Sequence, residues 1–183
     1  QNGADALLFT NLLDVRWLTG FTGSNGWAVL TADELTLGTD GRYGDRARSE
    51  TRSSGATVVA ESSQSRLHER LVDLLSNARG VALDPGTTTH AEWQRLAADL
   101  ELFPTASIVA VQRRVKDAAE VERIQSAAAA ADAALTEVEP MLFATVDHPV
   151  TESDIRSELE YRMRLHGADD RSYDTIVAAG PEH

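Results

Sequence analysis

The stretch NLLDVRWLTGFTGSNG, residues 11–26, decides the fold. Its last seven residues hold three glycines, and glycine lets a backbone take positive φ and approach a neighbouring chain closely. Short apolar runs of strand length come before it and after it, LLF at residues 7–9 and WAVL at residues 27–30. The pattern therefore predicts a shaped loop between two core strands.

The glycines do not form a phosphate-binding motif. Dinucleotide sites require G-x-G-x-x-G between a strand and a helix, and nucleoside triphosphate sites require a Gly-Lys-Ser/Thr ending. Neither pattern is present, and the single lysine of the chain is Lys116. Composition alone favours an ordinary surface loop between strands.

The composition is typical of a globular protein with an excess of acidic residues. A length of 183 residues suffices for one large domain, or for one complete domain and part of another. Apolar residues make up 42% of the chain, which is enough for a core. Because 29 acidic residues outnumber 17 basic ones, the formal net charge is -12, and we expect neither nucleic acid nor a membrane as a partner.

The residue types also bear on location. The absence of cysteine excludes a disulfide framework and a thiolate zinc site, and it fits the cytoplasm. The sequence contains no run of about 18 apolar residues, the length that would predict a membrane span. Its first residues lack the pattern of a signal peptide. The chain begins with Gln1 almost at the first strand, so we expect preceding residues to be absent from this numbering.

The string N-x-x-D-V-R-W-L-T-G-F-T-G-S-N-G, followed by TDGRY at residues 39–43, resembles the amino-terminal domain of Xaa-Pro aminopeptidases and prolidases, a family that includes creatinase. The resemblance implies an α/β domain with a mixed β-sheet flanked by helices. It also implies substrate-binding roles for Phe21, Arg42 and Tyr43. Arg42 either braces the loop or faces a substrate, and the rest of the charged segment 42–52 is interpreted as a solvated helix face.

Hydrophobic periodicity predicts alternating strands and helices in this region, with helices covering a mixed sheet. A turn or short helix at residues 11–18 should place Val15, Trp17 and Leu18 inward. The strands at residues 27–31 and 35–39 are close enough in sequence to form an antiparallel hairpin. The other expected strands are at residues 4–10, 57–60, 81–83, 102–103 and 108–111, and the other expected helices are at residues 42–52, 65–78 and 89–100.

A long amphipathic helix is predicted after Asp117, a suitable N-cap with Glu120 three residues later. Its alanine run, residues 127–131, gives a narrow stripe suited to close packing, and coiled-coil dimerisation is the competing interpretation. The sequence predicts that Pro140 interrupts the helix. The apolar face of the helix is expected to comprise Val121, Ile124, Ala128, Ala131, Leu135 and Val138.

Two further elements are predicted after Pro140. Just as one capping box, from Thr89 to Glu92, should begin the helix at residues 89–100, a second capping box, from Thr151 to Asp154, should begin another helix that ends near residues 166–167. Its inward face should carry Ile155, Leu159 and Met163. The segment YDTIVAAG, residues 173–180, predicts a strand that enters a Gly-Pro turn.

The strings R-x-V-K-D-A-A-E-V-E-R-I and Y-D-T-I-V-A-A-G-P, at residues 113–124 and 173–181, resemble the opening of the pita-bread metallopeptidase domain of the same family. We therefore expect residues 1–112 to be a creatinase/prolidase-like amino-terminal domain. Residues 113–183 are then the truncated start of an α+β pita-bread domain, with its first helices and strand.

The resemblance implies metal-dependent chemistry. Family members cleave the bond between a first residue and a following proline, using two divalent metal ions, often manganese, held by carboxylates and a histidine. His183 lies near the position of the family's first catalytic histidine, although Pro181-Glu182-His183 lacks the family's Pro-His pair. His183 is thus the one candidate catalytic residue, and the sequence assigns no metal ligand.

The remaining histidines and one acidic pair have simpler interpretations. The histidines show no His-x-x-x-His spacing, so we interpret them as surface or capping residues. Asp169 and Asp170 are interpreted as part of a solvated turn. These four histidines are His68, His90, His148 and His166.

Two classes of function stay open. The first is a proline-directed metallopeptidase, either an aminopeptidase or a dipeptidase, whose amino-terminal domain restricts substrate length and supports a homodimer. The second is a non-catalytic module of the same architecture that binds peptides or proteins. In either case proline-containing peptides are the expected partners, and residues 1–183 alone are expected to be inactive because the metal ligands are absent.

Overall fold

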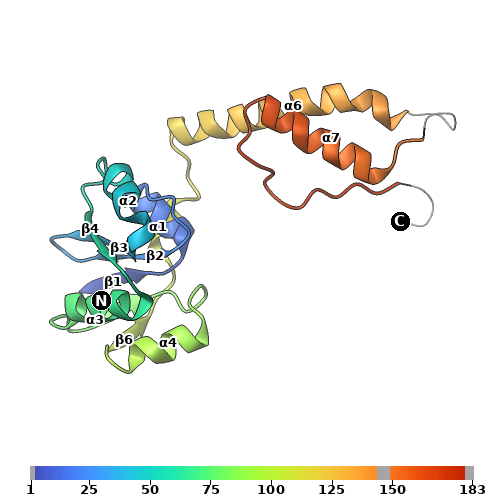
Figure 1. Cartoon of the computed structure of the whole chain (residues 1–183). Helices are drawn as coiled ribbons and strands as arrows, with labels where there is room; N and C mark the ends of the chain where they lie inside the picture. The colour runs from blue at the N-terminus through green and yellow to red at the C-terminus, as the bar shows by residue number, and fades with distance from the viewer. Residues whose placement is uncertain (1–2, 144–148, 180–183) are drawn as a thin grey trace. The chain divides into compact units, whose positions relative to one another are not determined.

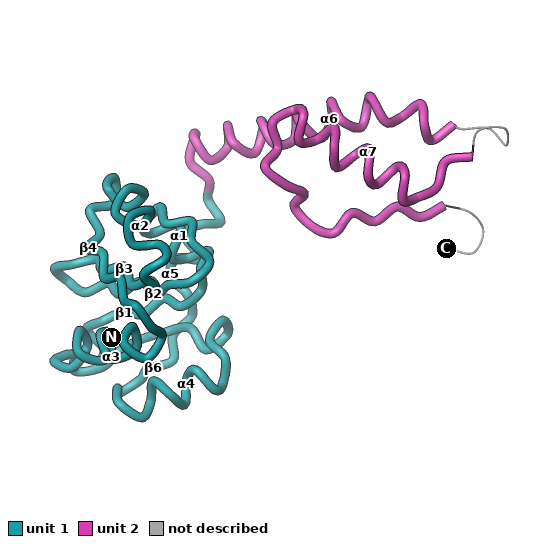
Figure 2. Tube along the Cα trace, viewed as in Figure 1, with its two compact units in different colours: residues 1–115 teal, residues 116–183 magenta. Residues whose placement is uncertain are grey.

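A computed structural model describes residues 3–143 and 149–179. Figure 2 shows that the chain divides into two compact units, residues 1–115 and 116–183. The predicted domain boundary, between residues 112 and 113, lies three residues before this division. In the described part, no helix combines the length and the apolar character that a membrane crossing requires.

The first unit is built on a mixed sheet, as the sequence predicts (Figure 1). Its described strands lie in the order β4-β3-β2-β1-β5-β6. The pairs β1–β2 and β2–β3 are antiparallel, and the pairs β3–β4, β1–β5 and β5–β6 are parallel. The strands are β1 (Ala6–Phe9), β2 (Gly26–Leu30), β3 (Leu35–Asp40), β4 (Thr57–Glu61), β5 (Val81–Leu83) and β6 (Leu102–Pro104).

The β2–β3 hairpin confirms the predicted strand pairing. Its register places Leu30 opposite Leu35 at the turn and Gly26 opposite Thr39 at the far end. The short connection favours this arrangement because antiparallel strands need only a tight turn between them.

Helices cover both faces of the sheet (Figure 1). Alternate side chains of each strand point to opposite faces, so Leu8 packs with α3 and α4 while Phe9 packs with α1, α2 and α5. The helices of this unit are α1 (Leu12–Thr19), the 3-10 turn η1 (Gly41–Tyr43), α2 (Gly44–Glu50), α3 (Gln64–Leu75), α4 (His90–Ala97) and α5 (Ile108–Gln112).

Helix α3 shows how the sequence places one of these helices. Ser63 caps it by accepting a hydrogen bond from the Arg66 N–H at 3.3 Å. Leu67, Leu71 and Leu75 follow at steps of four and are all buried. Each buried leucine contributes about 1.5–3 kcal/mol, so this stripe holds α3 against the sheet.

Two predictions for this unit are wrong. Trp17 is 43% exposed because α1 turns Asp14, Val15 and Thr19 inward, and Trp17 lies on the opposite face. Residues 108–111 form helix α5 and not a strand, because Ser107 caps the turn by accepting a hydrogen bond from the Ala110 N–H at 3.0 Å.

The second unit consists, in its described part, of α6 (Ala118–Leu142), α7 (Glu152–Leu165) and an extended tail, with the two helices packed together. The predicted N-cap at Asp117 and the predicted capping box at Thr151 are both present. The Asp117 side chain accepts from the Glu120 N–H at 2.8 Å, and Thr151 and Asp154 make the same reciprocal bonds. These caps set the starts of the helices where the sequence predicts them.

Three predictions for this unit are wrong. The buried stripe of α6 is Ala130, Ala134 and Val138. Val138 belongs to the predicted apolar face and Ala130 to the predicted alanine run, and the other five residues of the predicted face are exposed. Small alanines allow α7 to approach closely, so α7 covers the alanine stripe and leaves the larger apolar residues exposed. Pro140 lies inside the helix and not at an interruption, and the helix continues to Leu142.

The third error concerns the tail. Residues 173–179 form no strand in the described structure, and a strand needs a neighbouring strand for its hydrogen bonds. The Ala179 N–H instead donates to Glu152 Oε1 at 2.7 Å. The last residue of the predicted strand, Gly180, lies outside the described residues.

Candidate functional site

The glycine loop, residues 20–26, begins where α1 ends. Gly20 has a φ of 80°, and its N–H donates to the Arg16 carbonyl at 2.8 Å, which closes the last helical turn. A Cβ atom on Gly20 would lie 3.0 Å from the Glu50 carbonyl oxygen. Both the positive φ and the close approach therefore require glycine here.

The ring of Phe21 fills the inside of the loop. It is 1% exposed, and its backbone N–H donates to Thr19 Oγ1 at 3.1 Å. A Cβ atom on Gly23 would lie 2.1 Å from Phe21 Cζ, so the ring occupies space that only glycine leaves open. Tyr43 meets the ring edge-on, with centroids 5.8 Å apart and an interplanar angle of 83°. The loop is thus wrapped around a buried ring.

Glu50 at the end of α2 clamps the loop from outside. Its carboxylate accepts hydrogen bonds from the Thr22 N–H at 2.8 Å and from Thr22 Oγ1 at 2.7 Å. Arg46 Nε donates to the same carboxylate at 2.8 Å. Partial burial raises the pKa of Glu50, but the bonds from Arg46 and Thr22 outweigh burial and lower that pKa to about 2. The clamp is therefore charged across the neutral range.

A second acidic group holds the loop near its end. Asp40 accepts from Asn25 Nδ2 at 2.9 Å and from Arg42 Nε and Nη2, each at 2.9 Å. The Arg42 guanidinium is the largest cause that holds the pKa of Asp40 well below its usual range. Arg42 also lies 5.4 Å from the centre of the Tyr43 ring, a cation–π distance. Asp40 therefore orients both Asn25 and Arg42.

The three predicted substrate-binding residues lie together in this cluster. The side chain of Arg42 is 75% exposed. The Tyr43 hydroxyl lies 2.8 Å from Ser24 Oγ. That hydrogen bond is the main cause that lowers the pKa of Tyr43. Phe21 is buried beneath Tyr43, which suits a supporting role. Their contact with substrate stays a prediction, and the predicted catalytic His183 lies outside the described residues.

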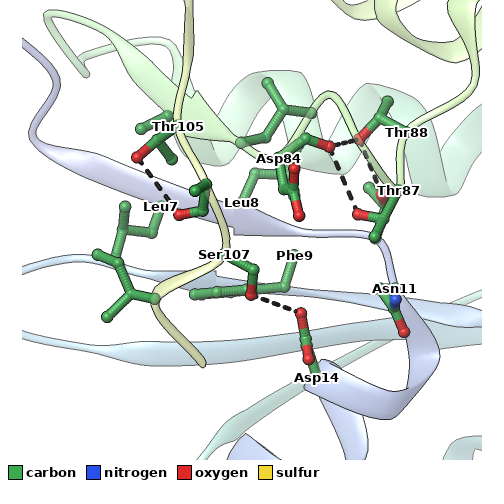
Figure 3. Close-up of a pocket in the computed structure, with 15 residues that line it drawn as sticks. Leu7, Leu8, Phe9, Asn11, Asp14, Asp84, Thr87, Thr88, Thr105 and Ser107 are labelled. Atoms are coloured by element: carbon green, nitrogen blue, oxygen red, sulfur yellow. Dashed lines mark hydrogen bonds between the residues drawn. The ribbon is translucent and has the colours of Figure 1, made fainter. Parts of the chain in front are cut away.

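A small cavity that the sequence did not reveal lies at the carboxyl ends of β1, β5 and β6 (Figure 3). Its volume is about 20 Å³, which is room for about one water molecule and not for a peptide. Buried Asp14 lies on its wall and accepts from Ser107 Oγ at 2.8 Å and from Arg113 Nη1 at 2.7 Å. These bonds fasten α5 and the end of the first unit to α1. The position of the polar residues directly after three parallel strands is the signal that would have found them.

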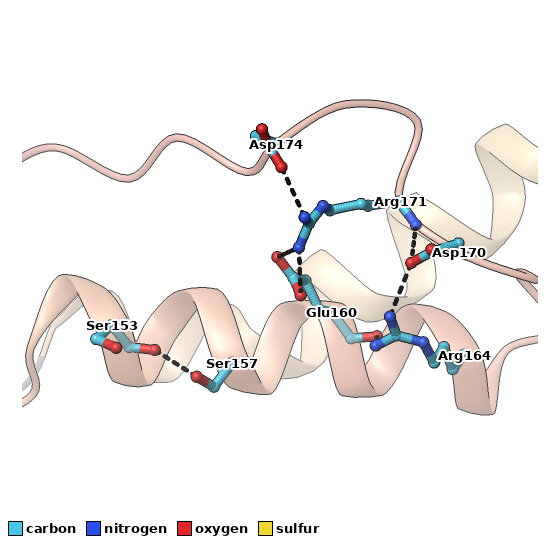
Figure 4. Close-up of polar contacts among 7 residues, drawn as sticks. All are labelled: Ser153, Ser157, Glu160, Arg164, Asp170, Arg171 and Asp174. Carbon is cyan, nitrogen blue, oxygen red and sulfur yellow. Dashed lines mark hydrogen bonds and ion pairs between the residues drawn. The ribbon is translucent and has the colours of Figure 1, made fainter.

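Glu160, Asp170 and Asp174 of the second unit are paired with arginines (Figure 4). Asp170 accepts from Arg164 Nη2 at 2.8 Å and Arg171 lies 3.3 Å from Glu160. The Arg171 backbone N–H is the largest cause that lowers the pKa of Asp170. His166 Nε2 lies 2.7 Å from Glu137 Oε1, so this histidine pairs with a single carboxylate. Across residues 3–143 and 149–179, no three His, Asp or Glu side chains converge as a metal site would require.

Comparisons with known proteins agree with the two-part organisation. Residues 1–115 match the family model described as the creatinase/prolidase N-terminal domain, and residues 122–183 match the model of metallopeptidase family M24. The chain is 30% identical to a protein described as the uncharacterized peptidase YqhT of Bacillus subtilis (strain 168), over 98% of this chain and 50% of that protein.

Two solved structures are similar along nearly the whole chain. The Xaa-Pro dipeptidase from Bacillus anthracis has a TM-score of 0.83 at 25% sequence identity. The matched region covers 94% of this chain and 47% of the dipeptidase chain. The X-Pro aminopeptidase from Thermotoga maritima MSB8 has a TM-score of 0.82 at 26% identity and covers 96% of this chain and 50% of its own. The chain thus spans about half the length of these relatives.

Replacing Gly23 with alanine should destabilise the first unit by about 1–3 kcal/mol, because the new Cβ overlaps the buried Phe21 ring. Urea unfolding followed by tryptophan fluorescence measures this, since Trp17, Trp27 and Trp93 all lie in the first unit. Gly41→Ala is the matched control, because its Cβ would have ordinary contacts of 3.5 Å or longer. Equal effects of the two substitutions would contradict the packing of the loop around Phe21.

The Glu50 clamp predicts a pH-dependent stability. Because the pKa of Glu50 is about 2 in the folded chain, below the ordinary 4.5, its stabilisation is present above pH 4.5 and is lost as the pH falls toward 2. Glu50→Gln should therefore cost about 1 kcal/mol at neutral pH, and the difference from wild type should shrink from about pH 5 to about pH 3. Urea unfolding at several pH values measures this difference.

Glu34→Gln is the control for that series, because Glu34 lies exposed in the turn of the β2–β3 hairpin and its side chain makes no hydrogen bond in the described structure. Its stability curve should follow that of wild type. A gap between Glu50→Gln and wild type that stays constant with pH would show that the carboxylate charge does not hold the loop.

Proposed function

The chain belongs to the family of the creatinase/prolidase N-terminal domain, and on that premise we propose that it is part of a proline-directed metallopeptidase that hydrolyses the Xaa-Pro peptide bond. The observation that carries the proposal is the order of the two family matches, residues 1–115 and then residues 122–183. The likeness to an Xaa-Pro dipeptidase and an X-Pro aminopeptidase over at least 94% of the chain supports it.

Membership of the metallopeptidase family implies divalent metal ions in full-length members. We propose two ions, with manganese as the metal, which would polarise the scissile carbonyl and activate water. The described residues do not fit as the metal-binding set, because they contain no convergent group of three His, Asp or Glu side chains. Residues 1–183 alone should therefore be inactive. We also propose that the full-length protein is a homodimer in the cytoplasm.

The glycine loop gives the first unit its part in this function. The two carboxylates Glu50 and Asp40 and the Phe21 ring hold the loop in one shape before any peptide arrives, which lowers the ordering cost of binding. Arg42 and Tyr43 then present a guanidinium and a phenol at the surface of that loop. We propose that these two groups contact the peptide, in the active site of the same or the partner subunit, and that Phe21 positions Tyr43.

Hydrolysis of defined peptides tests the proposed activity. The gene product that contains residues 1–183 should release alanine from Ala-Pro or from Ala-Pro-Ala when Mn²⁺ is added, and EDTA should abolish the release. Ala-Ala and Ala-Ala-Ala are the matched control peptides. Preference for the dipeptide or for the tripeptide distinguishes a dipeptidase from an aminopeptidase.

Each outcome of that assay is decisive. Turnover by residues 1–183 alone would contradict the proposed inactivity, and equal cleavage of the control peptides would contradict proline specificity. Binding of Ala-Pro-Ala without cleavage, in the presence of Mn²⁺, would favour the non-catalytic binding module of the same architecture.

Substitution of Arg42 tests the role of the loop in the active parent protein. Arg42→Ala should lower kcat/KM for the proline peptide about tenfold, because a charged hydrogen bond to the substrate is lost. Arg66→Ala is the matched control, since Arg66 is exposed on α3. If Arg42 only braces the loop, the substitution lowers the urea midpoint and leaves kcat/KM at the wild-type value.

A further inference from the structure

A second cavity of the first unit lies between the glycine loop and helices α3 and α4. Its volume is about 190 Å³. Residues 24–27 line it on the loop side, Gln64 and His68 line it from α3, and Glu92 and Arg95 line it from α4. Pockets for drug-sized ligands measure roughly 300–1,000 Å³, so this space suits a smaller molecule.

Two residues that line this cavity each carry a buried nitrogen atom without a hydrogen-bond partner among the described residues. These atoms are the indole Nε1 of Trp27, a residue that is 7% exposed, and Nδ1 of His68. A buried polar group without a partner costs roughly 1–3 kcal/mol, so such groups are rare in folded proteins and point to a ligand or a bound water. Both atoms belong to residues that line this one cavity, which separates it from an ordinary surface hollow.

Two charged groups of the cavity, Arg95 and Glu92, are also uncommitted, whereas His68 Nε2 lies 3.4 Å from Asp99 Oδ2. Across the described residues, Arg95 forms no ion pair, and the side chains of Gln64 and Glu92 make no hydrogen bond. Glu92 and Arg95 are three positions apart on α4, yet they do not pair with each other in the described structure. The cavity therefore presents a guanidinium and a carboxylate from the same helix, in contrast to the paired Arg46 and Glu50 of α2.

We propose that this cavity binds a small zwitterion, a free α-amino acid. Arg95 receives its carboxylate, with the Gln64 amide and the Trp27 indole N–H as further donors. Glu92 receives its ammonium group. Leu67, Leu71 and Leu96 also line the cavity and suit a short apolar side chain. This site is separate from the proposed peptidase chemistry and does not rest on it.

Titration with L-alanine, followed by ¹⁵N–¹H NMR of the indole groups of residues 1–183, tests the proposal. The Trp27 indole signal, assigned with Trp27→Phe, should shift and saturate at millimolar L-alanine. The Trp17 signal is an internal control, because Trp17 lies on α1 and does not line the cavity. Acetate, which carries only the carboxylate, should bind at least about fivefold more weakly, since it cannot pair with Glu92.

Three variants assign the roles of the charged residues. Arg95→Gln should weaken the binding of L-alanine at least about tenfold, and Arg95→Lys should restore part of it. Glu92→Gln should make L-alanine and acetate bind alike. Arg66→Gln is the matched control, because Arg66 is an exposed arginine of α3 that does not line the cavity. Urea midpoints of all variants verify that each one is folded.

Several results would overturn the proposal. They are a Trp27 signal that does not move at millimolar L-alanine, equal movement of the Trp17 and Trp27 signals, and equal effects of Arg95→Gln and Arg66→Gln. If acetate binds to wild type as tightly as L-alanine, the cavity is a simple anion site and the assignment of a zwitterion is wrong.

Discussion

The buried ring of Phe21 and the glycines around it form the constraint on which the first unit depends. Gly23 leaves the space that the ring fills, and a Cβ atom on Gly26 would lie 2.7 Å from the Gly38 carbonyl oxygen. The start of β2, where Gly26 pairs with Thr39, therefore requires glycine. A slip of one residue would turn every side chain of β2 to the other face. The packing of the loop thus also determines which residues fill the two cores.

Electrostatics hold the same loop from outside. Glu50 and Asp40 each accept hydrogen bonds from an arginine and from a residue of the loop, and in both cases these bonds lower the pKa of the carboxyl. A chain with a net charge of -12 tends to repel itself. Glu50 and Asp40 accept hydrogen bonds from loop residues that lie 28 and 15 residues away in sequence. Part of the acidic excess therefore stabilises the loop instead of destabilising the fold by repulsion.

The sequence was sufficient where an element depends on residues close to it. The β2–β3 hairpin and the capping box at Asp117 need only neighbours a few positions away, and both are present as predicted. Trp17 was misplaced because apolar character alone does not tell which face of α1 meets the sheet. The stripe on α6 was misplaced because two apolar stripes lie side by side, and only the position of α7 selects Ala130 and Ala134. The cavity of α3 and α4 joins residues 24–27, 64–71 and 92–96, and such a distant set leaves no local pattern.

Ser24 and Asn25 connect the two surfaces of the glycine loop. Their side chains bond to Tyr43 and Asp40 on the side of the predicted substrate-binding residues, and both residues also line the cavity of α3 and α4. A loop this short, with its backbone fixed at Gly20 and its inside filled by Phe21, cannot move one of these surfaces independently of the other. The arrangement of Arg42 and Tyr43 and the shape of the cavity are therefore set together, by the same packed ring.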